Sequence, residues 1–402
     1  MGLVRNILLL CALLCWATAP ARAQFVNNGS VISVQNGVAL NINTDFINIS
    51  GSILLFGDLN LSGNWANNDA AGAFQLASTG KVSLNGADQI ITGSAKTIFP
   101  NLILAGTGIK KLGANADVRA TLDLKDRELA IEDKNLELLA TATNALSYST
   151  GFISSDAKGY FYRHTNTADD YIFPLGSKIT GTFIYRPVTV QAKDNLDNTI
   201  GLSFVNKDPS AEGYDRALKR FDVNEVNSHY FYLADQKNGT SQLEYQFAFD
   251  KNTDGDFNQL VNWINFGLWE KAGVSNVRPS GASQPDYKLI TYTALKPASK
   301  LPLTMSFITP TNDPITIFNS FSPDGDGKND TWLIKNIDLF PDNELTILNR
   351  WGSEVYRAKA YNNANAWDGK GLSKGTYFYL LKVTINNEAK VYKGFITLLR
   401  ND

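Results

Sequence analysis

The chain has 402 residues, and its 37 Lys and Arg residues nearly balance its 39 Asp and Glu residues, giving a formal net charge of −2. This balance provides no basic excess, so we expect neither nucleic acid nor anionic lipid as a partner. The length exceeds what one hydrophobic core usually organises, and two or three domains are expected.

The N-terminal residues have the pattern of a secretory signal peptide. Arg5 precedes an apolar run over residues 7–16, and Ala21 and Ala23 supply the small residues of a cleavage site. This run is too short to anchor the chain in a membrane. We predict a signal peptide over residues 1–23, cleavage between Ala23 and Gln24, and no transmembrane segment in the mature chain.

The cysteine and histidine content restricts the chemistry. Cys11 and Cys15 both lie inside the predicted signal peptide. The mature chain therefore lacks disulfides, thiolate metal ligands and a cysteine nucleophile. The two histidines, His164 and His229, have no metal-ligand spacing around them. Zinc chemistry and Ser-His-Asp catalysis thus have little support.

Residues 24–148 contain a repeat. A pair of apolar residues separated by one position recurs every 20 to 23 residues. The pairs are Val38/Leu40, Leu59/Leu61, Val82/Leu84, Leu102/Leu104 and Leu122/Leu124. A repeat of this length, with Gly and Asn between the pairs, is typical of stacked rungs. We predict a short parallel β-helix-like domain of five or six rungs.

Residues 122–139 could instead form a charged amphipathic helix, since Glu, Lys and Leu favour helix. The apolar pairs here repeat every seven residues, but the members of each pair are two positions apart. A spacing of two places both side chains on one face of a strand, whereas a helical stripe needs spacings of three or four. We therefore predict three short strands.

Extracellular β-helices include polysaccharide lyases and hydrolases, so an enzyme has to be considered. The aspartates of this region form no recognisable catalytic pair, and most stand beside Asn, Gly or Lys in predicted turns. They are Asp58, Asp69, Asp88, Asp117, Asp123, Asp126 and Asp133. We expect a non-catalytic domain with an adhesive or structural role. The alternative is a polysaccharide-active enzyme or a carbohydrate-binding protein, with a surface glycan as its partner.

Residues 149–310 are rich in aromatic residues and in short strand-like runs, which predicts an antiparallel β-sandwich. One acidic loop in this segment follows the first positions of an EF-hand loop. Its candidate ligands are Asp250, Asn252, Asp254 and Asp256, but Val261 stands where the bidentate Glu belongs. A weak calcium site and a plain hairpin loop both fit this pattern.

A second acidic loop lies at residues 321–332, FSPDGDGKNDTW. Asp324, Asp326 and Asp330, with the carbonyl of Lys328, have the spacing of the first half of an EF-hand loop, which favours calcium. The glycines at 325 and 327 permit the positive φ angles that a tight loop requires. The alternative is a hairpin loop held by Asx-turns.

Residues 319–400 carry a series of short motifs in a fixed order. They include Phe321, Pro323, Gly325, Gly327, Asn329 and Trp332; Asn349, Arg350, Trp351 and Gly352; Trp367, Asp368 and Gly369; Gly375, Thr376 and Tyr377; and Gly394. This segment resembles the gliding-motility-associated C-terminal domain, the type B sorting domain of the Bacteroidetes type IX secretion system. Asp324 departs from the family's usual Asn, and Ser373-Lys374 replaces its usual Leu-Pro.

The resemblance implies an Ig-like sandwich of about seven strands over residues 311–402. It also implies export across the outer membrane, retention at the cell surface, and two partners: the type IX machinery and an outer-membrane barrel of the PorP/SprF family. We expect Trp332, Trp351 and Trp367 to be core residues, with a receptor-binding face as the alternative. The expected fold is thus all-β throughout, in three domains (24–148, 149–310 and 311–402).

Overall fold

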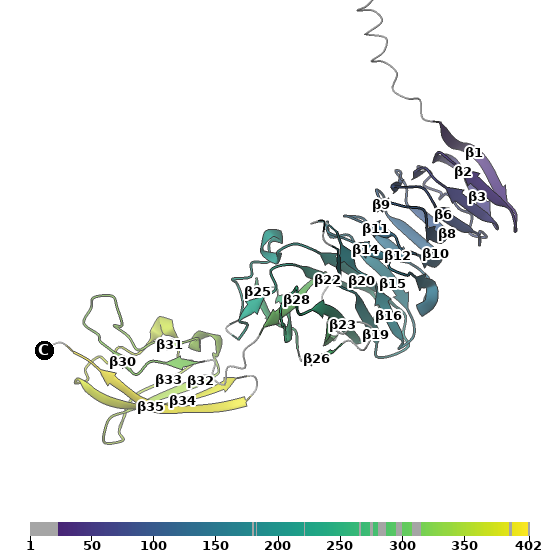
Figure 1. Cartoon of the computed structure of the whole chain (residues 1–402). Coiled ribbons are helices and arrows are strands. Elements are labelled where there is room, and N and C mark those ends of the chain that lie inside the picture. The colour runs from purple at the N-terminus through teal and green to yellow at the C-terminus, as the bar shows by residue number, and fades with distance from the viewer. Residues whose placement is uncertain are drawn as a thin grey trace, which may run out of the picture. The chain divides into compact units, whose positions relative to one another are not determined.

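The computed structural model describes residues 23–178, 181, 183–220, 222–264, 267–273, 276–279, 287–294, 300–307, 315–385 and 388–400. The predicted signal peptide, except for Ala23, lies outside these residues. The all-β prediction is confirmed, because the described residues form strands and short 3₁₀ helices but no α-helix (Figure 1). The chain divides into two compact units, residues 1–308 (unit 1) and 309–402 (unit 2).

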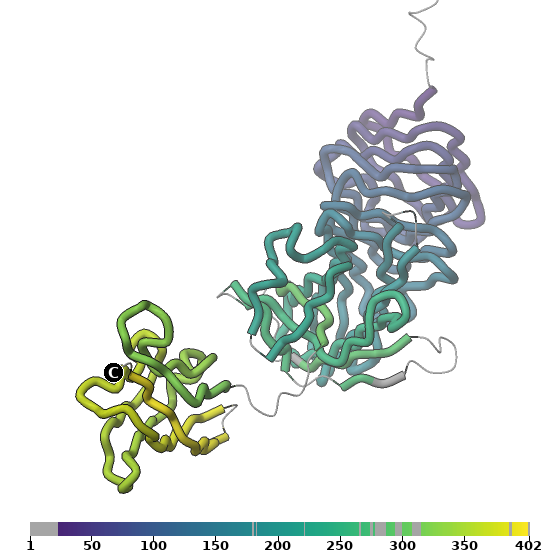
Figure 2. The backbone as a smooth tube through the Cα atoms, turned by 60° about the vertical axis from the view of Figure 1, so that its left-hand side comes forward, coloured from purple at the N-terminus to yellow at the C-terminus, as the bar shows by residue number. Residues whose placement is uncertain are grey.

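Unit 1 begins with a parallel β-solenoid of about seven turns over residues 24–163 (Figure 2). Each turn contributes a strand to each of two sheets. Sheet A contains β1 (Gln24–Val34), β3 (Asp45–Leu55), β5 (Trp65–Asn67), β7 (Gln89–Thr92), β9 (Lys110–Leu112), β11 (Glu128–Ala130) and β14 (Phe152–Ser154). Sheet B begins with β2 (Ala39–Ile42), β4 (Asp58–Leu61), β6 (Lys81–Leu84), β8 (Thr97–Leu104), β10 (Ala116–Asp123), β12 (Leu136–Leu138) and β15 (Phe161–Thr165).

The repeated apolar pairs from Leu59/Leu61 onward are stacked positions of sheet B, as predicted. The first pair was predicted one step out of register, because Val38 lies outside β2 and is exposed, and Leu40 and Ile42 stack on Leu59 and Leu61. Leu40 pairs with Leu59, Leu59 with Val82, Val82 with Leu102, and Leu102 with Leu122. From Leu59 onward these side chains are fully buried. The predicted count of five or six rungs was too low, because the last rung, containing β15, does not have a pair of this form.

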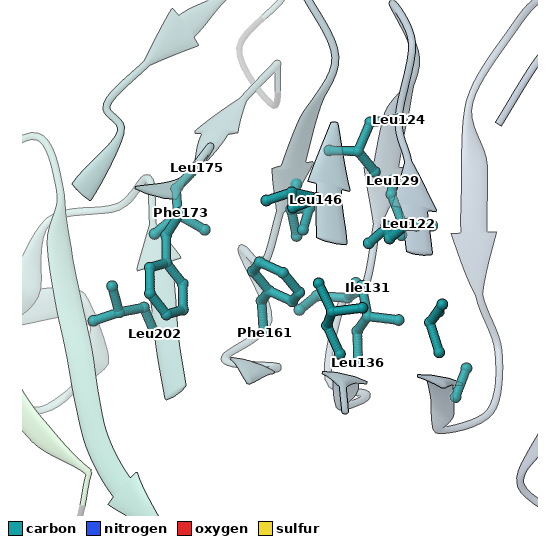
Figure 3. Close-up of a cluster of buried hydrophobic side chains, with 14 of the residues drawn as sticks. Leu122, Leu124, Leu129, Ile131, Leu136, Leu146, Phe161, Phe173, Leu175 and Leu202 are labelled. Atoms are coloured by element: carbon teal, nitrogen blue, oxygen red, sulfur yellow. The ribbon is translucent and has the colours of Figure 1, made fainter. Parts of the chain in front are cut away.

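The three strands predicted within residues 122–139 are confirmed. They are the end of β10, then β11 and β12. The paired side chains of Leu122/Leu124, Leu129/Ile131 and Leu136/Leu138 are all fully buried. Figure 3 shows several of these leucines gathered in one cluster with Phe161. Burial of every pair inside the solenoid outweighs the intrinsic helix preference of the surrounding charged residues.

Two ladders run between the rungs of sheet A. The amide of Asn27 donates to Asn48, and that of Asn48 donates to Asn67, both at 3.0 Å. Next to this ladder, Phe25 stacks on Phe46 at 5.7 Å between centroids, and Phe46 stacks on Trp65 at 4.6 Å. Because the amides are buried, each hydrogen bond satisfies polar atoms that water does not reach.

The solenoid continues into antiparallel strands within unit 1. β15 pairs antiparallel with β20 (Asn198–Val205), so sheet B extends through β22 (Phe231–Asn238), β28 (Leu301–Phe307), β24 (Gln259–Ile264) and β25 (Leu268–Lys271). A separate antiparallel sheet contains β16 (Asp170–Phe173), β19 (Val188–Ala192), β23 (Leu243–Asp250), β27 (Tyr287–Ala294) and β26 (Asn276–Pro279). One hydrophobic cluster includes residues of both regions. Residues 148 and 149, where we predicted a domain boundary, lie inside this unit.

Unit 2 is built on a mixed five-stranded sheet in the order β30, β35, β34, β32, β33. The strands are β30 (Ser320–Phe321), β32 (Asn343–Leu348), β33 (Glu354–Lys359), β34 (Gly375–Ile385) and β35 (Glu388–Leu398). β30 is parallel to β35, and the other neighbours are antiparallel. A two-stranded ladder of β29 (Thr316–Ile317) and β31 (Ile334–Lys335) completes the unit.

Candidate functional sites

The motifs of residues 321–377 meet in the core of unit 2. Trp332 and Trp367 are buried and form a β-bridge with each other. The Trp332 indole N–H donates to the carbonyl of Phe318 at 2.6 Å. The Tyr361 hydroxyl donates to the Trp332 carbonyl and accepts from the Trp367 N–H at 3.0 Å. These motif residues therefore hold segments together that are distant in the sequence, and two of the three tryptophans are core residues, as expected.

Two motif glycines are required by close packing. Gly369 has φ +64°, and a Cβ there would lie 3.0 Å from the methyl groups of Leu398. A Cβ at Gly394 would lie 2.7 Å from the Tyr379 hydroxyl. The motif at these positions therefore preserves the fold of the unit.

Trp351 was predicted to be a core residue, and this was wrong. It is 80% exposed at the tip of the β32–β33 hairpin. The Asn349 side chain accepts the N–H groups of Trp351 and Ser353 at 2.9 and 3.0 Å, and Gly352 has φ +80°. Because residues 349–353 form a tight loop between the two strands, the indole projects beyond the sheet and lies against the Arg350 guanidinium, 5.4 Å from the ring centre.

A row of apolar side chains crosses the outer face of the same sheet. Leu348 of β32 pairs with Phe378 of β34, which pairs with Phe395 of β35. Phe378 and Phe395 are 46% and 51% exposed. Leu348 ends the strand that leads into the Trp351 hairpin. We call Leu348, Trp351, Phe378 and Phe395 the hairpin patch. Exposed apolar side chains gathered in this way are typical of interaction surfaces.

The acidic loop of unit 2 brings its three aspartates together. Asp324, Asp326 and Asp330 each offer a carboxylate oxygen within 4.8 Å of the other two. Asp330 accepts the backbone N–H groups of Gly325 and Gly327 at 2.6 and 2.8 Å, and the Lys328 N–H donates to Asp326 at 2.7 Å. Both glycines have φ near +80°. The cluster is a candidate metal site, and most of it is exposed.

The acidic loop of unit 1 is arranged differently. Asp254 is buried and accepts from the guanidinium of Arg186, with Nε to Oδ2 at 2.7 Å and Nη2 to Oδ1 at 2.5 Å. The Tyr230 hydroxyl and the Asp250 N–H also donate to Oδ2, at 2.7 and 3.0 Å. Asp250 itself accepts the Asn252 N–H, and Asp256 pairs with Lys288. Asp254 therefore joins the loop to the core of the unit.

Most aspartates considered in the solenoid hold turns or exposed ion pairs. Asp69 accepts the Gly51 N–H at 2.9 Å, and Asp88 accepts the Ile109 N–H at 2.8 Å. Asp117 pairs with Lys96, and Asp123 pairs with Lys125 at 2.7 Å. Asp126 and Asp133 pair with the adjacent Arg127 and Lys134.

Other carboxylates, which sequence reasoning did not single out, line a groove of about 540 Å³ on sheet A. We call it the polar groove. Glu128, Glu132 and Asp156 line it, with Lys111 and Lys178. Glu132 pairs with Lys111 at 2.9 Å. The sequence around them gave no signal, because Glu128 and Glu132 lie on one turn and meet Asp156 of the next turn only through the stacking of the rungs.

Glu128 is the most constrained of these groups. Its side chain is buried, and Oε1 accepts the Ser154 hydroxyl at 2.7 Å. Oε2 has no hydrogen-bond partner among the described residues. Burial raises the pKa of the Glu128 carboxyl, and the negative charges of Asp156 and Glu132 raise it further. Burial also raises the pKa of Asp156, although its carboxylate accepts from Asn206 N–H and from Ser177.

A second groove, of about 560 Å³, adjoins the end of the solenoid. We call it the aromatic groove, since Tyr148, Phe183 and Tyr185 line it with Ile172 and Pro187. The Phe183 side chain is 47% exposed, and its ring packs against Phe152 with centroids 4.8 Å apart. A half-exposed ring in a concave surface is a common feature of ligand sites.

Unit 2 is thus a small β domain with a tryptophan-centred core, an acidic loop and an exposed hairpin. Residues 315–398 match the family described as the CHU_C type IX secretion signal domain. The chain therefore carries a type IX secretion signal, as the sequence motifs predicted. Neither a curated protein nor a solved structure matches the chain.

The secretion signal indicates how the protein is exported. It implies secretion by the type IX system, translocation across the outer membrane to the cell surface or extracellular space, and interaction with the secretion machinery. Within the described residues, no helix is both long and apolar enough to span a membrane.

Proposed function

We propose that the protein is a cell-surface protein whose unit 1 has an adhesive or structural role and no catalytic activity. The observation that carries this proposal is the type IX secretion signal in unit 2, attached to a stacked β-solenoid that continues into antiparallel sheets. Solenoids present extended, rigid surfaces, which suits attachment to a partner outside the cell.

Deletion of residues 319–402 tests the export step. The truncated protein should accumulate in the periplasm, whereas the intact chain should be labelled by a membrane-impermeant reagent on whole cells. The control is the substitution Leu196→Ala, which changes an exposed side chain of unit 1 and should leave surface labelling unchanged. Surface labelling of the truncated protein would contradict the proposal.

We further propose that an outer-membrane barrel of the PorP/SprF family retains the protein, and that the hairpin patch is the contact. Two phenylalanines about half exposed on a sheet, beside a tryptophan on a hairpin, would be costly to leave in water without a partner. Trp351→Ala should release the protein into the medium while unit 2 stays folded, because the indole contributes nothing to the core. Leu339→Ala, which also removes an exposed apolar side chain of unit 2, should have no effect.

The acidic loop of unit 2 is proposed to bind calcium. Its support is the EF-hand-like spacing of Asp324, Asp326 and Asp330 and the mutual distance of their carboxylates. Calcium at about 10⁻⁴ to 10⁻³ M, the range of extracellular modules, should raise the melting temperature of unit 2. Replacing the three aspartates with Ala should abolish this rise, and an equal rise in the variant would refute the site.

A second candidate function is a polysaccharide-active enzyme with the same secretion signal. The observation that favours it is the convergence of Glu128, Glu132 and Asp156 on the polar groove. Glycoside hydrolysis uses two carboxyl groups, one with a raised pKa that serves as general acid. Release of reducing sugar from polysaccharides, lost in Glu128→Gln, would establish it. No release from any polysaccharide tested would leave the non-catalytic proposal standing.

A further inference from the structure

We propose that the polar groove and the aromatic groove of unit 1 form one extended site that binds a neutral oligosaccharide. The inference rests on the adhesive function proposed above and names the class of ligand. The two grooves have different linings, and each lining matches a different part of a sugar chain.

The grooves are neighbours, because they share one cluster of side chains. Lys178 lines the polar groove, and its Nζ lies 5.4 Å from the ring centre of Phe152 and 5.6 Å from that of Phe183. Phe183 in turn lines the aromatic groove. Lys178 of the polar groove and Phe183 of the aromatic groove are therefore in contact with each other over the buried Phe152 ring. A chain of several sugar units that passes over Lys178 and Phe183 would occupy both grooves.

The aromatic groove offers flat apolar surface to the carbon-bound hydrogens of a sugar ring. Phe183 and Ile172 are 47% and 40% exposed, and Tyr185 lies 6.2 Å from Phe183 with the rings nearly stacked. Rings held this way bury apolar surface on binding without a large loss of side-chain freedom. The volumes of both grooves fall within the range of about 300 to 1,000 Å³ that ligand sites show.

The polar groove offers hydrogen-bonding groups to hydroxyls. Glu128 is only 8% exposed, lines the groove, and has one carboxyl oxygen without a partner among the described residues. A buried oxygen of this kind is costly unless something donates to it, and a ligand hydroxyl would. Asn64 lies on the same lining and can both donate and accept. Gln89 also lines the groove, but both of its donors are used by the Leu61 and Gly63 carbonyls.

The net negative charge of the polar groove disfavours anionic ligands. Four acidic residues line it, Asp88, Glu128, Glu132 and Asp156, against two lysines, Lys111 and Lys178. An anionic ligand such as a phosphate or a polyuronate would meet an excess of negative charge. Hydroxyl groups, which donate to carboxylates and accept from lysines, satisfy both kinds of residue. The chemistry therefore favours a neutral saccharide.

The test uses the full mature chain and three neutral probes: cellohexaose, xylohexaose and mannohexaose, measured by isothermal titration calorimetry. At least one should bind. Phe183→Ala and Glu128→Gln, one in each groove, should each weaken binding about tenfold or more, which corresponds to about 1.4 kcal/mol. Leu196→Ala is the matched control outside both grooves and should bind like the wild type.

Three results would overturn the inference: no binding of any probe, wild-type affinity in both groove variants, or tighter binding of oligolysine than of every hexasaccharide. Circular dichroism of each variant checks that the protein is still folded, so that a loss of affinity can be assigned to the substituted side chain. Surface labelling of the same variants on whole cells separates this inference from the proposed route, because Phe183→Ala should reach the surface normally while losing affinity. Loss of surface delivery with intact saccharide binding would count against the route alone.

Discussion

The substitution Asp254→Asn distinguishes a structural aspartate from a calcium ligand in the acidic loop of unit 1. Asp254 and Arg186 are buried together, with side-chain exposures of 5% and 4%. Burial alone would lower the pKa of Arg186, but hydrogen bonding to Asp254, together with the electrostatic interactions with Tyr230, Asp254 and Tyr287, raises the pKa. The substitution keeps the shape of the side chain and removes its charge, so the guanidinium is left buried without a counter-charge.

The loss of unfolding free energy in Asp254→Asn depends on the hydrogen-bond acceptors that Arg186 retains. Breaking one side of a buried ion pair costs about 3 to 5 kcal/mol. Arg186 retains three acceptors: the Tyr185 carbonyl at 2.8 Å, the Thr253 hydroxyl at 3.0 Å and the Tyr287 hydroxyl at 3.1 Å. These acceptors partly compensate the guanidinium N–H groups that lose Asp254. We therefore expect a loss near the lower end of this range, about 3 kcal/mol of unfolding free energy for unit 1.

The assay is urea unfolding of the mature chain with calcium and with a chelator, fitted to two transitions because the chain has two units. Asp256→Asn is the control. Asp256 is exposed and pairs only with Lys288 in the described loop, so its loss should cost about 0 to 1 kcal/mol. The reasoning would be refuted by a loss at Asp254 no greater than at Asp256, or by a loss that appears only when calcium is present.

Two further predictions concern the solenoid. Asn48→Ala removes both rungs of the amide ladder around it and should cost about 1 to 3 kcal/mol, since each net hydrogen bond contributes about 0.5 to 1.5 kcal/mol. The buried partners Asn27 and Asn67 each lose one hydrogen bond and keep another, to Ser30 and Asp69. Asn60→Ala, which breaks only the exposed 2.9 Å contact to Asn41, should cost under about 0.5 kcal/mol in the same urea titration. Burial, with the nearby charge of Arg127, lowers the pKa of Lys110 to about 8. The unfolded chain holds that proton until about pH 10.4, so between these values the folded state binds fewer protons and stability should rise with pH. The rise should be missing in Lys110→Met, and identical slopes for the two proteins over this window would contradict it.

The sequence predicted the solenoid well because its signal is periodic and local. The pairs from Val38/Leu40 to Leu122/Leu124 recur at nearly constant spacing, and each pair fixes a strand by its own alternation. The secretion signal was equally accessible, since its motifs are short and follow in order. In both cases the informative residues are neighbours in the chain.

What sequence could not supply depends on contacts between distant residues. Asp254 looked like a calcium ligand because its partner, Arg186, is 68 positions away. Asp156 joins Glu128 and Glu132 only through the stacking of one rung on the next. Trp351 was assigned to the core from its residue type, but the hairpin loop that carries it projects into solvent. In this tight loop no other described part of the unit covers the Trp351 indole, which is 80% exposed.

The amide ladder and the register of sheet B have a consequence for how such a protein can change over evolution. The rungs from β2 to β8 each offer their neighbour a similar apolar pair and a similar strand edge, so duplication of one of them creates no new kind of interface. A gain of one rung would lengthen the solenoid by about 4.8 Å and leave the antiparallel strands and unit 2 unchanged. Length is therefore a property that this architecture can vary by small steps, independently of the signal that exports it.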